Sequence, residues 1–227
     1  MLRAGDISLD IKGTFFRVGT EDFQTNLIGK FNIYNCLAAI SVAKHLGLNM
    51  DQCKQALAKV TGVPGRMEAI NEGQNFNVLI DYAHDPASFA IIFETIKFFP
   101  KKRIIHVFGS AGGVRDHVKR PVLGKLSGEH ADISIITDED SYDEPIAKIL
   151  NEIAAGAIMG GKIENENLFK ITDRREAIKY ACQMAQEGDL VLITGKGTEQ
   201  SIKSNGKEMP WDDRNVTREV LREIINL

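Results

Sequence analysis

Four short segments of this sequence combine carboxylates, cations and glycines, the residue types that bind anions and amines. They are 81–85 (Asp-Tyr-Ala-His-Asp), 109–116 (Gly-Ser-Ala-Gly-Gly-Val-Arg-Asp), 138–144 (Asp-Glu-Asp-Ser-Tyr-Asp-Glu) and 195–199 (Gly-Lys-Gly-Thr-Glu). A guanidinium pairs with a carboxylate through two parallel hydrogen bonds, and grouped carboxylates suit an ammonium. Each segment alone is also typical of a polar loop, so the prediction depends on all four lying together.

A structural alternative stays open for each segment. Asp81 and Asp85 can cap the helix that follows them, and the charge run 138–144 can be a solvated loop. Residues 109–113 can cradle an anion with their backbone amides, or they can form a tight turn that exposes Arg115 to solvent.

The spacing of the residues disfavours several other kinds of site. No segment has the Gly-x4-Gly-Lys-Ser/Thr spacing of a P-loop or the Gly-x-Gly-x-x-Gly spacing of a dinucleotide site. Ser110 has no obvious base, and no Gly-x-Ser-x-Gly elbow is present, so nucleophilic hydrolysis is poorly supported. No His/Cys cluster has metal-ligand spacing, so we expect no metal site.

Alternating strand and helix patterns position these segments. Apolar runs predict strands at 78–80, 103–108, 132–137, 169–171 and 190–194, and helical patterns follow near 86, at 121–130, from 145, at 174–186 and at 212–226. Such alternation is typical of parallel βαβ units. We therefore predict an α/β, Rossmann-like, mostly parallel sheet with helices on both faces. Ligands bind beyond the carboxyl ends of the strands in such a sheet, where all four segments fall.

The first sixty residues have a different pattern. Residues 7–18 alternate apolar and polar side chains around a glycine, which predicts a β-hairpin. Helical patterns follow at 32–46 and 50–60. The breaker cluster Gly-Val-Pro-Gly at 62–65 predicts a domain boundary, giving domains 1–63 and 64–227.

Composition excludes several classes of partner. The chain has 227 residues, 43% hydrophobic and 26% charged, with a formal net charge of -3. No basic stripe predicts nucleic-acid binding, and no run approaches the roughly 18 apolar residues of a membrane span. The N-terminus lacks a signal-peptide core. The widely spaced Cys36, Cys53 and Cys182 favour core packing in a reducing cytoplasm, which we expect as the location.

Six segments, in chain order, resemble the motifs of the Mur ligases. They are 29–39 (G-x-x-N-x-x-N-x-L-A-A), 62–68 (the join between two domains), 81–86 (D-Y-A-H-x-P), 115–121 (R-D-x-x-K-R-P), 195–199 (G-K-G-x-E) and 210–214 (P-F-D-D-R, with Trp in place of Phe). The resemblance covers nearly the whole chain. The last three motifs point to members that add the third residue of the peptidoglycan stem peptide.

The resemblance implies a reaction. Mur ligases use ATP, with Mg2+, to activate a carboxylate as an acyl phosphate, which an amine attacks to form an amide. Here the implied partners are UDP-N-acetylmuramoyl-dipeptide and an incoming amino acid. Residues 1–63 would be the end of the central ATP-binding domain, and 64–227 the C-terminal domain.

The resemblance also implies roles for individual residues. The implied nucleotide contacts are Asn32, Asn35, Arg66, Asp81 and His84, the last two also as catalytic groups. Arg115 would pair with the α-carboxylate of the amino acid and Glu199 with its distal amino group. The other implied amino-acid contacts are Asp138, Glu139, Asp140, Ser141 and Gly195, and Lys119 and Arg120 would add positive potential for phosphates.

Two departures from the family pattern bear on the substrate. Diaminopimelate-adding members carry D-N-P-R after the third strand, whereas this chain has Asp-Glu-Asp-Ser at 138–141. A second substrate carboxylate would meet acidic groups there, so we expect lysine or ornithine to be favoured over diaminopimelate. Thr198 replaces the histidine of G-K-G-H-E.

The family's P-loop and nucleotide-sugar domain are expected upstream of residue 1, so we expect this chain alone not to turn over ATP. Two alternatives remain. One is another Mur-like ligase, of the cyanophycin or folylpolyglutamate type. The other is a non-catalytic module that uses the same sheet to bind an amino acid or a partner.

Overall fold

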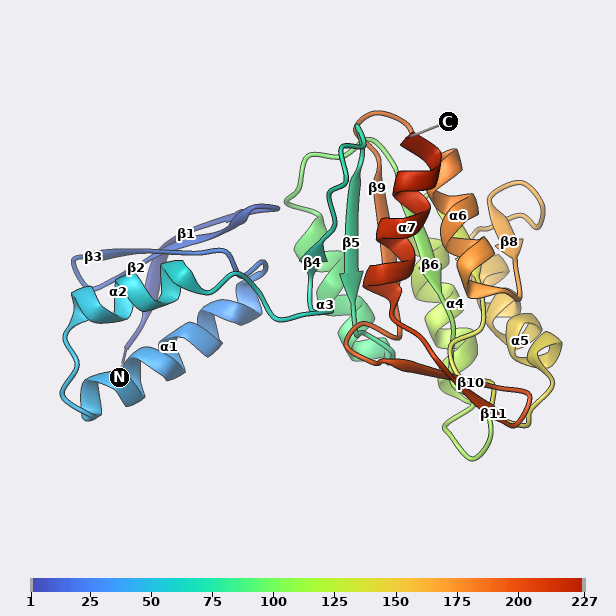
Figure 1. Ribbon diagram of the computed structural model, residues 1–227, viewed down its shortest axis with the longest axis horizontal. Helices are drawn as coiled ribbons and strands as arrows, with labels where there is room; N and C mark the ends of the chain where they lie inside the picture. The colour runs from blue at the N-terminus through green and yellow to red at the C-terminus, as the bar shows by residue number, and fades with distance from the viewer. Residues whose placement is uncertain (1, 226–227) are drawn as a thin grey trace. The chain divides into compact units, whose positions relative to one another are not determined.

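The computed structural model describes residues 2–225, and its chain divides into two compact units (Figure 1). Residues 1–63 with 94–99 form the first unit, and residues 64–93 with 100–227 form the second.

Among the described residues, no helix is long and apolar enough to cross a membrane. The three cysteines are buried and carry no disulfide.

The first unit is a three-stranded antiparallel sheet with two helices. Its elements are β1 (Ala4–Asp10), β2 (Gly13–Val18), β3 (Glu21–Thr25), α1 (Lys30–His45) and α2 (Met50–Lys59). The predicted hairpin and both helices are confirmed. β3 was missed because only Phe23 and Thr25 of its five residues are buried, and Phe23 stacks on Phe16 of β2. Asn49 begins α2 with a capping box.

The second unit is built on a six-stranded sheet with the order β4-β5-β9-β6-β7-β8. The strands are β4 (Glu68–Ala69), β5 (Asn77–Asp81), β6 (Ile104–Phe108), β7 (Ile133–Ile136), β8 (Leu168–Lys170) and β9 (Leu190–Thr194). All neighbours pair in parallel except β4, which is antiparallel to β5. The central strands are buried along their whole length, which explains their continuous apolar runs.

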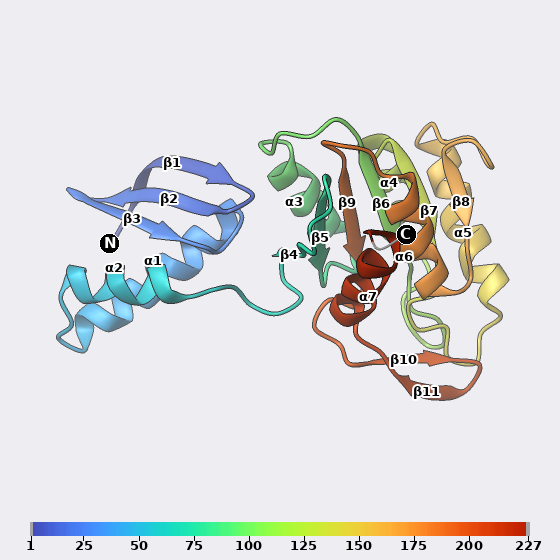
Figure 2. The same ribbon diagram turned by 45° about the horizontal axis from the view of Figure 1, so that its top comes forward.

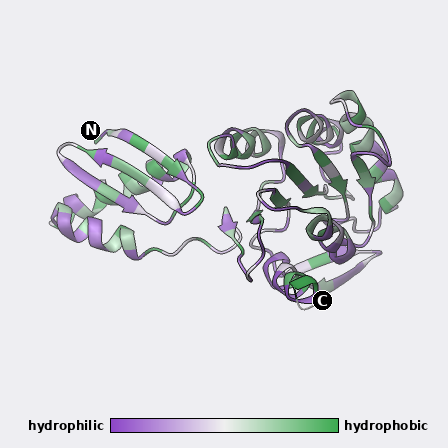
Figure 3. Cartoon of the chain, turned by 90° about the horizontal axis from the view of Figure 1, so that it is seen from above, coloured by the Kyte–Doolittle hydropathy of each residue, from purple (hydrophilic) through white to green (hydrophobic). Residues whose placement is uncertain are grey.

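Helices cover both faces of this sheet (Figures 2 and 3). They are α3 (Pro86–Ile96), α4 (Lys119–His130), α5 (Ile146–Met159), α6 (Arg174–Met184) and α7 (Asp213–Ile225). His106 and Phe108 of β6 face α3, where both contact Phe89. Ile105 and Val107 belong to the core cluster beneath α6 and α7. The predicted α/β architecture, with its strands and helices, is confirmed.

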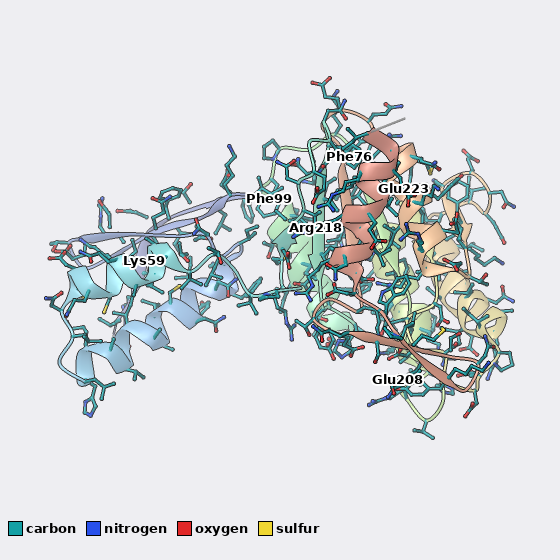
Figure 4. All side chains as sticks on the ribbon, in the orientation of Figure 1. Lys59, Phe76, Phe99, Glu208, Arg218 and Glu223 are labelled. Carbon is teal, nitrogen blue, oxygen red and sulfur yellow. The ribbon has the colours of Figure 1, made fainter. Side chains whose placement is uncertain are left out.

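Two features of the second unit were absent from the sequence prediction. β4 is a two-residue edge strand, and Arg218 of α7, labelled in Figure 4, donates to Glu68 of this strand at 3.0 Å. A hairpin of β10 (Ser201–Ser204) and β11 (Lys207–Pro210) follows β9. Its turn is Asn205-Gly206, and both residues have positive φ, as an Asn-Gly hairpin turn requires.

Candidate functional site

A pocket of about 640 Å³ lies where β5, β6, β7 and β9 end. Its walls come from the loops after all four strands and from the β10 strand. The lining residues are Tyr82, His84, Asp85, Ala111, Arg115, Asp116, Lys119, Glu139, Asp140, Tyr142, Gly195, Glu199, Gln200, Ser201 and Lys203. The structure therefore brings together the four segments that the sequence singled out.

Glycines after β6 let its loop approach the loop after β7. A Cβ on Gly109 would lie 2.5 Å from the carbonyl oxygen of Thr137, and one on Gly112 would lie 2.4 Å from that of Ser141. The amide of Gly112 donates to Asp140 O at 2.7 Å, and the amide of Gly113 donates to Glu144 at 3.2 Å. These two amides bind the neighbouring loop, so they are not free to bind an anion.

Lys196 neutralises two of the pocket's carboxylates. Its ammonium is almost fully buried, donates to Asp140 Oδ1 at 2.9 Å and also bonds Glu199 Oε2. Asp140 Oδ1 also accepts the backbone amide of Lys203 at 2.7 Å. The Tyr82 hydroxyl donates to Glu199 Oε1 at 2.9 Å. Asp140 and Glu199 thus have partners inside the protein.

Glu139 differs from those two acids. The residue is 6% exposed, and its Oε2 atom has no hydrogen-bond partner. Burial raises the pKa of its carboxyl group, against the attraction of Arg174, Lys119, His84 and Lys196. Glu139 is thus a buried acid of the pocket with one carboxylate oxygen that no group in residues 2–225 hydrogen-bonds.

The cations that line the pocket are Arg115, Lys119 and Lys203, and the His84 ring lies beside them. Arg115 is exposed on the loop after β6, beside the Tyr142 phenol, whose hydrogen bond raises the pKa of the guanidinium. Lys119 Nζ donates to the carbonyl of His84 at 2.8 Å. His84 Nδ1 lies 2.9 Å from the carbonyl of Tyr82, so a ligand would meet its Nε2 atom.

Two other residues with implied nucleotide roles do not line the pocket. Asp81 is buried and accepts the backbone amides of Met67 at 2.8 Å and Ala83 at 2.7 Å. Burial raises the pKa of Asp81, although these hydrogen bonds oppose the shift. The guanidinium of Arg66 lies 4.5 Å from the centre of the Tyr82 ring. In this structure the Asp81 carboxylate holds the chain around Met67, which has a positive φ.

Asp138 and Ser141 are also away from the pocket wall. Asp138 accepts the amide of Ser141 at 3.0 Å and its hydroxyl at 3.1 Å, so the two residues close their own loop. Burial raises the pKa of Asp138. These two hydrogen bonds explain how Asp138, at the start of the acidic run, can be buried, while Asp143 further along the run is exposed.

Arg120, which the resemblance places near phosphates, is fully buried. It pairs with Glu144 at 2.7 Å and Glu152 at 2.7 Å, and it donates to the carbonyl of Ala111 at 3.1 Å. These contacts hold the Arg115 loop against the start of α5, so the structure does not bring Arg120 to the pocket. Asn32 and Asn35 lie in the first unit, where the Asn35 amide donates to Asn32 Oδ1 at 2.9 Å.

Sequence reasoning missed several residues of the site. Tyr82 and Lys196 lie inside recognised motifs, and their spacing gave no sign that both bond Glu199. Tyr142 and Lys203 line the pocket from the acidic loop and from β10. The Asn-Gly pair after β10 was a usable signal for that hairpin. No group of three His, Cys, Asp or Glu residues in the described chain could hold a metal ion.

Comparisons with known proteins identify a family and several relatives. Residues 65–197 match the family described as Mur ligase, glutamate ligase domain. The UDP-N-acetylmuramyl-tripeptide synthetase of Roseiflexus sp. (strain RS-1) is 43% identical over 227 residues, covering 98% of this chain and 44% of the relative. A UDP-N-acetylmuramoyl-L-alanyl-D-glutamate--2,6-diaminopimelate ligase of Syntrophomonas wolfei is 41% identical over 224 residues, covering 97% and 45%.

Solved structures show the same fold. A UDP-N-acetylmuramoyl-L-alanyl-D-glutamate--2,6-diaminopimelate ligase superposes with a TM-score of 0.69 at 29% identity, covering 99% of this chain and 46% of that one. A folylpolyglutamate synthase of Mycobacterium tuberculosis superposes with a TM-score of 0.65 at 19% identity, which shows a shared fold alone. This chain spans less than half the length of the two curated relatives.

Proposed function

The chain belongs to the Mur ligase family, and from that premise we propose that it holds the incoming amino acid in an ATP-dependent, amide-forming ligase. The amino acid would be joined to the carboxyl group of UDP-N-acetylmuramoyl-dipeptide, and the product would be used in peptidoglycan synthesis. The relatives support this proposal by their names, which include both a tripeptide synthetase and a diaminopimelate ligase. Because those names differ in specificity, the amino acid must be argued from the site.

One observation carries the proposal: an exposed guanidinium and five acidic side chains line the same pocket. Arg115 can bind an α-carboxylate through two parallel hydrogen bonds. Glu139, Asp140 and Glu199 also line the pocket, and because the last two share the single Lys196 ammonium, the three acids together exceed the cation that pairs with them and would favour a cationic side chain. An amino acid with a side-chain amine satisfies both ends. We therefore propose lysine or ornithine, rather than diaminopimelate, as the substrate.

The residues of this chain act by binding and orientation. Amide formation needs the α-amine of the amino acid held close to an activated carboxyl group, and fixed geometry lowers that barrier. Arg115 would anchor the α-carboxylate beside the α-amine, and the acidic groups would fix the far end of the side chain. Tyr142, which lies beside Arg115 in the same pocket, would help to position the guanidinium.

ATP supplies the activation of the carboxylate in this proposal. Arg66 and Lys119 give the second unit positive groups that suit phosphates. The described carboxylates form no group suited to Mg2+, so we assign no metal ligand to this chain. The buried, unpaired cysteines agree with a reducing cytoplasm as the compartment.

Calorimetric titration of the chain with lysine, ornithine and meso-diaminopimelate tests the proposal. We expect lysine or ornithine to bind and Arg115→Ala to weaken binding roughly 10-fold or more, because a charge-assisted hydrogen bond contributes about 1.5–3 kcal/mol. Arg222→Ala is the matched control, since Arg222 is exposed on α7 and pairs with Glu72. Absence of amino-acid binding, or equal affinity in Arg115→Ala, would refute the proposal.

A further inference from the structure

We propose that Tyr82 is a positioning residue of the amino-acid pocket, which fixes the Glu199 carboxylate with its hydroxyl and holds the Arg66 guanidinium against its ring. This inference rests on the function proposed above. It connects two groups that the proposed function uses separately, since Glu199 lines the amino-acid pocket and Arg66 is a positive group suited to phosphates.

Tyr82 follows directly after β5 and contacts two segments that are distant in the sequence. Its hydroxyl donates to Glu199 Oε1 at 2.9 Å. The guanidinium carbon of Arg66 lies 4.5 Å from the centre of its ring, where the electrons of the ring attract a cation. One side chain therefore joins the segment that precedes β4 to the loop that follows β9.

Two glycines bring the backbones of these segments into contact with Tyr82. A Cβ on Gly197 would lie 2.6 Å from the Cα atom of Tyr82 and 2.6 Å from the carbonyl oxygen of Gly65. A Cβ on Gly65 would lie 2.2 Å from the carbonyl carbon of Gly197. Both glycines have positive φ, 39° for Gly197 and 68° for Gly65, which other residues rarely adopt. This close packing fixes the distance that the Tyr82 hydroxyl spans to Glu199.

Glu199 needs the contact with Tyr82 because its other internal partner is shared. The Lys196 ammonium bonds Glu199 Oε2 and also pairs with Asp140 at 2.9 Å. The Glu199 side chain is 37% exposed, so this single contact would leave its carboxylate free to rotate. The Tyr82 hydroxyl on Oε1 gives the second oxygen a partner. A carboxylate already held in one orientation binds an ammonium without first losing its rotational freedom.

Arg66 acts on the same hydrogen bond through the ring. Burial raises the pKa of the Tyr82 phenol, Glu199 raises it further, and Arg66 opposes the shift. The phenol therefore keeps its proton at neutral pH and can donate it to Glu199. A positive charge over the ring makes the hydroxyl a stronger donor, so Arg66 should strengthen the bond to Glu199.

Calorimetric titration of lysine into Tyr82→Phe, Glu199→Gln and the double variant tests the inference, because Tyr82→Phe removes the hydroxyl and keeps the ring. We expect Tyr82→Phe to weaken lysine binding roughly 3- to 10-fold, the range for one hydrogen bond. In the Glu199→Gln background the same change should alter the affinity less than about twofold, because the charge that Tyr82 positions is absent. Tyr180→Phe is the matched control, since Tyr180 packs on Phe169 and does not line the pocket.

NMR of the chain labelled at the ζ carbon of tyrosine supplies a second readout at neutral pH. The Tyr82 resonance, assigned by its loss in Tyr82→Phe, should move in Glu199→Gln and in Arg66→Gln, because both partners act on the phenol. Arg222→Gln is the control and should leave it unchanged, since Arg222 is exposed and pairs with Glu72.

The outcomes separate this inference from the proposed function. If Tyr82→Phe binds lysine as tightly as the unaltered chain, or weakens binding equally in both backgrounds, Tyr82 does not position Glu199 and the inference is overturned. An unchanged Tyr82 resonance in Glu199→Gln overturns it as well. If Arg115→Ala still weakens lysine binding in those cases, the amino-acid pocket stands. If the unaltered chain binds no lysine, the proposed function fails and the inference fails with it.

Discussion

Arg174 and Asp213 form an ion pair that is sealed from solvent, with Nη2 of the arginine 2.7 Å from Oδ2 of the aspartate. The same guanidinium donates to the carbonyl of Asp138 at 3.1 Å and to that of Thr194 at 2.8 Å. Arg174 thus joins the ends of β7 and β9 to the start of α7. This side chain therefore helps to set the spacing of the loops after β7 and β9.

Removal of Asp213 should therefore destabilise the second unit severely. Asp213→Ala leaves the buried guanidinium uncompensated and also removes the acceptor of the Trp211 indole at 2.8 Å. We expect the free energy of unfolding to fall by about 3–5 kcal/mol, measured by urea denaturation followed by tryptophan fluorescence. Glu72→Gln, which breaks the exposed pair with Arg222, should change it far less. Similar losses in both variants would contradict this assignment.

Stability should decrease as pH rises through the titration of Glu139. Burial raises the pKa of this carboxyl, so between its ordinary and raised pKa the folded chain holds a proton that the unfolded chain has lost. Stability that protonation provides is then lost as pH rises through that window. Glu139→Gln should flatten this dependence and raise the free energy of unfolding near neutral pH by about 1–3 kcal/mol. Urea denaturation at pH 5 and pH 8 measures both effects. A variant less stable than the unaltered chain at pH 8 would contradict the expectation.

His106 should remain neutral throughout the usual pH range. Burial lowers its pKa to about 3, and its ring nitrogens lie 2.9 Å from the Ser127 hydroxyl and 3.0 Å from the Thr194 hydroxyl. Because the unfolded histidine titrates near 6.5, the unfolded chain binds a proton that the folded chain does not, and stability is lost as pH falls from about 6.5 towards 3.

Histidine NMR resonances followed from pH 8 to pH 4 check this prediction, with the His106 signal assigned by its loss in His106→Gln. The ring of His106 should show no titration in that range. The exposed His45 provides the comparison within the same spectrum. A His106 midpoint near pH 6.5 would show that the ring is accessible to solvent and the hydroxyl network is absent.

Helices α4 and α5 should tolerate no side chain at their closest approach. A Cβ on Gly124 would lie 1.9 Å from the carbonyl oxygen of Ile153, and one on Gly156 would lie 1.9 Å from that of Pro121. Gly124→Ala should lower the free energy of unfolding by about 1–3 kcal/mol or more, because the backbones must separate. Gly5→Ala is the control, since nothing lies within 4 Å of its Cβ. Thermal unfolding measures the difference, and equal midpoints would contradict the close packing.

Local patterns were sufficient to predict most elements of the second unit. β9 was placed at residues 190–194, as observed, and the structure confirms the other strands to within one or two residues. A continuous apolar run needs only its own sequence to indicate a buried strand. The short β4 and the polar strands β10 and β11 lack such a run, and their pairing depends on neighbours far away in the chain.

The residues of the site were predicted less completely than the fold. His84, Arg115, Glu139 and Glu199 were expected at one edge of the sheet, and all four line one pocket. The motif of Arg120 suggested that this residue also belongs to the site. The structure shows instead that Arg120 is buried and pairs with Glu144 and Glu152, so its contacts stabilise the fold.

The sequence by itself determined the succession of strands and helices and the polar segments that end the parallel strands, because both depend on the local periodicity of side chains. Only the tertiary structure decided that β9 lies between β5 and β6, since strand order depends on pairing between distant segments. It alone also decided which acids Lys196 neutralises and that Glu139 Oε2 has no hydrogen-bond partner among the described residues. Charge pairing depends on distances in space, and the spacing of residues along the chain does not predict those distances.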